Sequence, residues 1–152
     1  MDDEGMTEPE RAPRIDGDTC SYSGYDAQVE WASLGEMATR YWSDHARTGD
    51  GSYGPAQEFV AEITEVGDPL AVEVIQSLVD AAPTDVALDF VGAGPLEDLL
   101  SHNRHGLTFV DEVERRARRD PRFRSAVTGL WLSKDVPESV RTRLGALGAR
   151  LI

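Results

Sequence analysis

The stretch Val91-Gly92-Ala93-Gly94-Pro95-Leu96-Glu97-Asp98-Leu99-Leu100 decides how the chain is divided into helices. It is an apolar segment that two glycines and a proline interrupt, and two acidic residues follow the interruption. Glycine can end a helix with a positive φ, and proline suits the first position of the next helix. The sequence therefore predicts a tight corner between two helices, with Gly94 as N-cap and with Glu97 and Asp98 in the first turn, where the helix dipole favours negative charge.

A glycine-rich turn before a helix can also bind phosphate through its backbone N–H groups. Here Glu97 and Asp98 would repel the phosphate, and the lysine of a phosphate-binding loop is missing. We therefore interpret the candidate motif as a structural corner first and a functional site second. Its members are Gly92, Gly94, Pro95, Glu97 and Asp98.

The overall composition is that of one ordinary domain with a hydrophobic core, since 40% of the 152 residues are hydrophobic. The single cysteine, Cys20, cannot form an internal disulfide, and the acidic start Met1-Asp2-Asp3-Glu4 does not resemble a signal or transit peptide. No apolar run approaches the length of a membrane span. We therefore expect a cytoplasmic protein without a membrane association.

The net charge of −13 is unevenly distributed along the chain. Residues 1–100 carry 22 acidic and 4 basic residues, whereas residues 101–152 carry 6 acidic and 11 basic residues. Such an asymmetry indicates either an acidic surface for a partner or two halves that complement each other when packed.

Residues 1–25 are rich in acids, proline and glycine and poor in apolar residues, which predicts a disordered acidic tail. Residues 26–152 are predicted to form one all-α domain of short antiparallel helices, arranged as helical hairpins or as a short α-solenoid-like stack. A helix from about residue 27 would carry an aromatic stripe that packs in the core. The stripe consists of Trp31, Leu34, Ala38, Tyr41, Trp42 and His45.

The later helices are expected to begin and end at recognisable residues. Gly67 is expected to end the helix that begins near residue 56. Asp68-Pro69 and Asp120-Pro121 each look like an N-cap followed by proline at the first helical position.

The central motif and its continuation carry a resemblance to a known family. The continuation consists of His105-Gly106, Phe109-Val110-Asp111 and Ala117-Arg118-Arg119-Asp120-Pro121-Arg122-Phe123-Arg124, and it ends at Trp131. Over roughly residues 30–132, and most strongly from residue 90 onward, the chain resembles a bacterial family known as domain of unknown function 6869. The resemblance supports a helical fold, and it supplies no catalytic residue because the family has no established activity.

One cluster of residues could serve a metal-dependent hydrolase. Asp98 and His102 are four residues apart and so share a helix face, Glu97 is adjacent, and His105 follows one turn later. A carboxylate and two imidazoles can hold a divalent metal. However, an Asp98–His102 pair near a helix C-terminus explains these residues without a metal, and Arg104 would oppose a bound cation. We therefore predict no catalytic residue, no metal and no cofactor.

An arginine cluster is the strongest charge feature of the second half, and it could form a patch that contacts phosphate or nucleic acid. Acidic residues are interleaved with these arginines, and no aromatic residues are available for stacking on bases. Contacts to the acidic first half or to the tail explain the cluster more simply, so we do not expect nucleic acid. The cluster consists of Arg115, Arg116, Arg118, Arg119, Arg122 and Arg124.

The activity itself does not follow from the sequence. The leading hypothesis is a small cytoplasmic domain that binds another protein and is not an enzyme, because acidic residues abound and no coherent catalytic set is present. An immunity-protein-like role, in which an acidic surface captures a basic toxin, is one concrete version.

Overall fold

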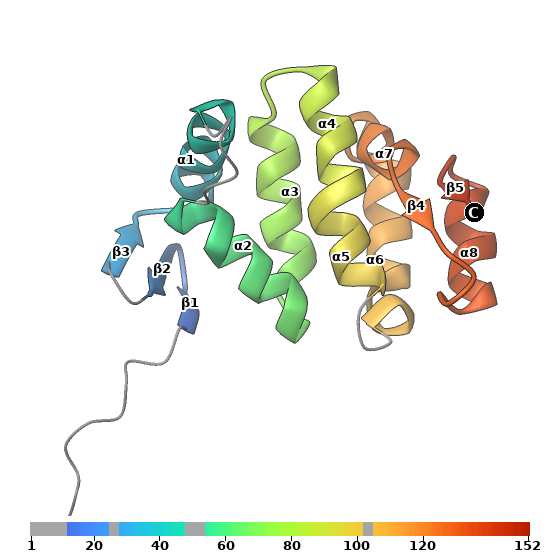
Figure 1. Cartoon of the computed structure of the whole chain (residues 1–152), viewed down its shortest axis with the longest axis horizontal. Helices are drawn as coiled ribbons and strands as arrows, with labels where there is room; N and C mark the ends of the chain where they lie inside the picture. Colours follow the sequence, from blue (N-terminus) through green and yellow to red (C-terminus); the bar gives the residue numbers. More distant parts are fainter. Residues whose placement is uncertain (1–11, 25–27, 48–53, 102–104) are drawn as a thin grey trace, which may run out of the picture.

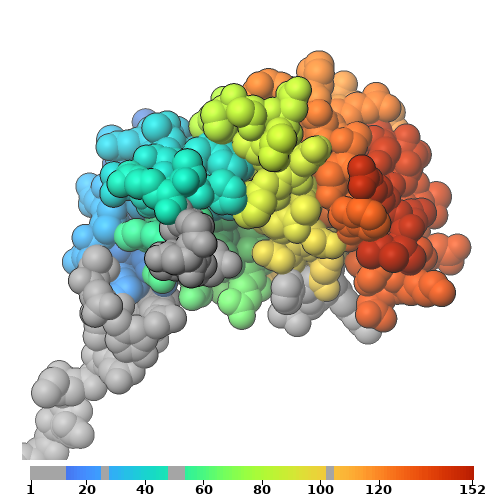
Figure 2. All heavy atoms as spheres, turned by 45° about the horizontal axis from the view of Figure 1, so that its top comes forward, coloured from blue at the N-terminus to red at the C-terminus, as the bar shows by residue number. Residues whose placement is uncertain are grey.

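The computed structural model of the chain describes residues 12–24, 28–47, 54–101 and 105–152. The helices follow one another broadly in sequence order along the long axis, from α1 beside the three-stranded sheet at one end to α8 at the other (Figure 1). The space-filling view shows the same progression on the surface (Figure 2). The strands are β1 (Ala12–Asp16), β2 (Thr19–Ser23), β3 (Gln28–Trp31), β4 (Trp131–Leu132) and β5 (Arg150–Leu151). The helices are α1 (Leu34–Arg47), α2 (Pro55–Val66), α3 (Ala71–Ala81), α4 (Asp85–Val91), the π-helix η1 (Gly92–Leu96), α5 (Glu97–Ser101), α6 (His105–Arg119), α7 (Pro121–Thr128) and α8 (Glu138–Gly145).

The all-α prediction is wrong, because two small sheets accompany the helices. β1, β2 and β3 form an antiparallel sheet in that order, and β4 pairs with β5 in parallel. Strand β2 alternates buried Cys20 and Tyr22 with more accessible residues. This alternation spans five residues, two of them serine and one threonine, and so gives a weak apolar period that the helical interpretation missed.

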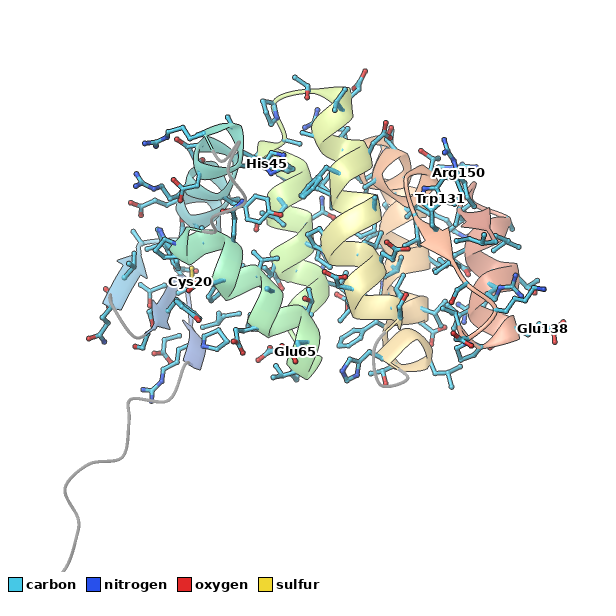
Figure 3. The ribbon with its side chains drawn as sticks, viewed as in Figure 1. Cys20, His45, Glu65, Trp131, Glu138 and Arg150 are labelled. Carbon is cyan, nitrogen blue, oxygen red and sulfur yellow. The ribbon has the colours of Figure 1, made fainter. Side chains whose placement is uncertain are left out.

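Residues 12–24 belong to the folded part of the chain, so the prediction of a disordered tail is wrong for them. Cys20, labelled in Figure 3, has 1% of its surface exposed, and its Sγ lies 3.7 Å from the carbonyl oxygen of Ser33. Burial, with a smaller effect from Glu36, raises the pKa of the Cys20 thiol to about 11. The thiol is therefore neutral and serves the core. The rest of the predicted tail, residues 1–11 and 25, lies outside the described residues.

The predicted aromatic stripe lies in the core but is not one helix. Trp31 belongs to β3 and packs edge-on against Phe59 of α2, with ring centroids 5.6 Å apart. Helix α1 begins only at Leu34. Trp42 of α1 donates its indole N–H to the carbonyl oxygen of Leu78 at 2.9 Å, which fixes α1 against α3.

Two of the predicted helix boundaries are confirmed and one is wrong. α2 ends at Gly67, which takes the left-handed conformation with φ 66°. Asp120 caps α7 by accepting a backbone N–H of the first turn. In contrast, α3 has Leu70 at its N-cap position, because the Asp68 carboxylate accepts the N–H of Leu70 and closes a turn before the helix.

The predicted corner at Gly92-Ala93-Gly94-Pro95 is also wrong, since the chain stays helical from α4 through η1 into α5. Pro95 lies inside η1. A proline in a regular α-helix removes one hydrogen bond and clashes with the carbonyl four residues earlier. The wider π-turn inserts one residue and changes the hydrogen-bond spacing at that point, so that the helix can pass through Pro95 without breaking.

Gly92 is needed for close contact between helices and not for a turn. Its φ of −63° is helical, and a Cβ at this position would collide with the carbonyl oxygen of Ala126 in α7. A reciprocal contact involves Gly129, directly after α7, where a Cβ would lie 2.6 Å from the carbonyl oxygen of Asp89. The backbones of α4–η1 and α7 therefore touch, and no side chain separates them at this crossing.

We expect Gly92→Ala to destabilise the protein by about 1–3 kcal/mol, because the added methyl group meets backbone that cannot rotate away. Thermal or urea unfolding followed by circular dichroism would measure the change.

Gly94→Ala is the matched control two residues away. A Cβ at Gly94 would be 3.5 Å from the ring of Phe90, which is ordinary contact, and alanine reduces the entropy lost on helix formation. This variant should be neutral or more stable by up to about 1 kcal/mol. Equal losses in the two variants would show that the helix crossing is not what requires Gly92.

Candidate functional site

The two acids of the central motif lie on α5, directly after the π-turn. Glu97 is half-buried and Asp98 is exposed. Burial raises the pKa of the Glu97 carboxyl above its ordinary value, and the negative charge of Asp98 adds to this shift. The sequence predicted these acids in the first turn after a corner, but no corner precedes them. Their proximity costs free energy when both carboxylates are charged.

Further acids extend this charge onto α2, which runs obliquely from below α1 to the lower end of α3 (Figure 1). Glu58, Glu62 and Glu65 follow one helix face at spacings of four and three residues. Glu65, near the end of α2 in Figure 3, lines a cavity of about 280 Å³ together with Asp98. We call this surface the acidic face; it consists of Glu58, Glu62, Glu65, Glu97 and Asp98.

The carboxylates of Glu58, Glu62 and Glu65 form no ion pair with any residue that the structure describes. Acids that serve the fold behave differently. Glu114 of α6, for example, binds Arg143 of α8 at 2.8 Å, and this hydrogen bond lowers the pKa of Glu114. The α2 part of the acidic face is therefore available to positive charges outside the chain.

The metal-site hypothesis rests on Glu97, Asp98, His102 and His105, and His102 lies outside the described residues. His105 holds the end of α2: its Nε2 lies 3.2 Å from the carbonyl oxygen of Glu65, and its ring packs against Gly67. Within residues 12–24, 28–47, 54–101 and 105–152, no three potential ligands come together as a metal would require. The sequence analysis considered His105 only as a possible metal ligand and did not predict its contact with the end of α2.

Three of the six clustered arginines have partners in the fold. Arg116 pairs with Glu112 at 3.0 Å, and Arg118 pairs with Glu114 at 3.4 Å, both within α6. Both partners are interleaved acids of the same helix. The sequence had instead suggested partners in the acidic first half or in the tail.

Arg122 binds backbone. Its Nη2 donates to the carbonyl oxygens of Val79 and Ala82, each at 2.9 Å. The last carbonyls of a helix lack partners within that helix, and they carry partial negative charge. Arg122 therefore caps the C-terminus of α3 from α7.

Arg115, Arg119 and Arg124 are exposed and have no ion-pair or hydrogen-bond partner among the described residues. Arg115 and Arg119 line a cavity of about 320 Å³ between α3 and α6, together with Arg116, Gln76 and Asp120. Guanidinium groups around a cavity can bind an anion. Here the carboxylate of Asp120, which accepts a hydrogen bond from Gln76 at 2.9 Å, reduces the positive charge of the cavity.

One groove has no counterpart among the sites expected from the sequence. It has a volume of about 550 Å³ and lies between β3 and α1, where residues 28–31 had been interpreted as the start of a helix. The usable signal was the alternation at residues 19–23, because a strand there needs at least one partner strand from a neighbouring segment.

The structure thus defines a stack of helices with two small sheets, an acidic face on α2 and α5, and arginines on α6 and α7 that are partly paired with neighbouring acids. The family of unknown function DUF6869 matches residues 53–151, so the chain belongs to that family. The matched region begins later and ends later than the resemblance suggested, and it leaves out the three-stranded sheet and α1. No curated protein and no solved structure matches the chain. Among the described residues, no helix has the length and apolar character required to cross a bilayer.

We expect Arg122→Met to lower the stability by about 1–3 kcal/mol, because two carbonyl oxygens lose a charged donor. Arg124→Met removes the same charge from an arginine that lacks a partner and should change stability by less than about 0.5 kcal/mol. Urea unfolding of both variants measures the difference, and similar losses would contradict the capping role.

A second prediction concerns the raised pKa of Glu97. Because the folded state binds this proton more tightly than the unfolded state, the carboxylate destabilises the fold at neutral pH, and this cost disappears below the ordinary glutamate pKa of about 4.3. Glu97→Gln should therefore raise the melting temperature at pH 7 and leave it almost unchanged at pH 4. Glu73→Gln, at an exposed acid on α3, is the control. An equal gain at both pH values would exclude this explanation.

Proposed function

We propose that this protein works by binding another protein through the acidic face. The observation that carries the proposal is the row of α2 carboxylates Glu58, Glu62 and Glu65, which have no cationic partner among the described residues. Most charged residues of α6 and α8 are, in contrast, paired with one another. A one-signed surface of this kind attracts a basic partner and accelerates encounter with it.

The acidic face lies within the region matched by the family, residues 53–151, and so belongs to the part of the chain that defines the family. A basic protein toxin captured by an immunity-like protein is the concrete version that we favour. The proposed setting is the cytoplasm of a bacterium, in keeping with the free thiol of Cys20 and the absence of a second cysteine.

The test is affinity purification of the tagged full chain from native lysate at low salt, with the captured proteins quantified by mass spectrometry. We expect one stoichiometric partner. The triple variant Glu58→Gln, Glu62→Gln and Glu65→Gln should lower its capture about tenfold or more, because it removes the charges that the partner faces.

The matched control removes three exposed acids elsewhere, by Glu73→Gln, Asp89→Asn and Asp135→Asn. It should retain capture. If no stoichiometric protein appears, or if both triple variants lose capture equally, the acidic face is not a binding surface. Co-purified nucleic acid that Arg115→Gln and Arg119→Gln remove would instead support the arginine alternative.

A further inference from the structure

The register of the three-stranded sheet shows which residue pairs exchange backbone hydrogen bonds. A two-residue turn, Gly17-Asp18, joins β1 to β2, so the closing pair Asp16 and Thr19 is hydrogen-bonded. Hydrogen-bonded and non-hydrogen-bonded pairs alternate from there. Pro13, which has no N–H, falls in a non-hydrogen-bonded pair with Tyr22, as this alternation requires.

The alternation fixes which groups of β3 point away from the sheet. Cys20 and Tyr22 turn their backbone groups toward β3, where they pair with Trp31 and Val29. The N–H and C=O of Glu30, between these two residues, therefore point to the opposite side. No strand of the described residues lies on that side, because β3 is the last strand of its sheet.

One contact supports this assignment independently. Ala32, two residues after Glu30, points its N–H to the same side, and the Glu36 carboxylate of α1 accepts it at 2.7 Å. The edge donor nearest to α1 thus has a side-chain acceptor, and no described group binds the N–H of Glu30.

This edge borders the groove of about 550 Å³ between β3 and α1. Val29, Glu30 and Trp31 form the strand side, and Glu36, Thr39 and Arg40 are among the residues of the helix side. Arg40 pairs with Asp44 at 3.3 Å, and Asp44 also lies 3.8 Å from Arg47, whereas Glu30 and Glu36 form no ion pair with a described residue. The groove therefore combines unpaired backbone groups with unbalanced negative charge.

We propose that this groove binds an extended peptide segment of a partner protein, which adds to β3 as a fourth strand. Main-chain hydrogen bonds to Glu30 would supply affinity, and side chains that alternate between the two faces would supply specificity. Positions opposite Glu30 share its outer face and suit lysine or arginine. The intervening positions face the same side as Trp31, which is buried, and suit apolar residues.

This surface is distinct from the acidic face, and its recognition rests on backbone geometry as well as on charge. A second copy of the chain is a poorer occupant, because an antiparallel β3–β3 pairing would bring the two Glu30 carboxylates near each other.

The probe is a capped, fluorescein-labelled heptapeptide, Lys-Val-Lys-Val-Lys-Val-Lys, titrated with the full chain and followed by fluorescence anisotropy. We expect saturable binding, and we expect none for the peptide with glutamate in place of lysine. A peptide with the same lysines and valines in scrambled order should bind about tenfold more weakly, because it cannot separate the two residue types onto two faces. Equal binding of the scrambled peptide would overturn the proposal.

The main-chain hydrogen bonds are tested first by substitutions at Glu30 of the protein and then by changes to the peptide. Glu30→Pro removes the outward N–H without touching the ladder to β2, and it should weaken binding about tenfold or more. Glu30→Gln keeps the N–H and should weaken binding only about threefold. Circular dichroism of both variants checks that the fold is retained.

Should Glu30→Pro fail to fold, N-methylated peptides give the same information on the unaltered protein. One peptide carries a methyl group on every lysine amide, and a second peptide carries it on every valine amide. Only one of the two peptides should lose binding, because alternate N–H groups of a strand face its partner. Equal effects in the two peptides would overturn the proposal. So would a concentration-dependent dimer in light scattering that Glu30→Pro removes, since the occupant would then be a second copy.

Discussion

The contact between the backbones of α4–η1 and α7 is the constraint on which the rest of the stack depends. At Gly92 and Gly129 there is no room for a Cβ, so these two elements approach until main chain meets main chain. A contact of this kind defines the distance and the angle of two helices more strictly than interdigitated side chains do, because backbone cannot change rotamer. Helix α3 packs on both α4 and α7, and helix α6 packs on α7. The positions of α3 and α6 therefore depend on the contact between α4–η1 and α7.

The apolar periodicity of the sequence was sufficient to find most helices, because a helix that packs on one face repeats its buried residues regularly. α2 was found with its end at Gly67, and α7 was found with its cap at Asp120. The sheet could not be found in this way. Its strands are four or five residues long and bury few residues, so only pairing with a neighbour distinguishes them from a loop.

The candidate site shows the same division between local and long-range information. The arginine cluster was visible in the sequence, but its roles depend on distant partners. Arg122 and Arg124 look equivalent in the chain, and yet the first binds carbonyls of Val79 and Ala82 and the second is exposed. The groove beside β3 had no counterpart in the sequence analysis, because it arises from tertiary placement of a strand edge next to α1.

The π-turn at η1 also sets the rotational phase of everything that follows it in the same helical rod. Each residue of an α-helix advances by about 100° around the axis, and the π-turn holds one more residue than a regular turn would. Without that residue, Leu99 and Leu100 would rotate out of the core, and Asp98 would turn away from Glu65 on α2. The stretch that the sequence suggested as a boundary between two helices thus sets the rotation of α5, and with it the direction in which Asp98 faces.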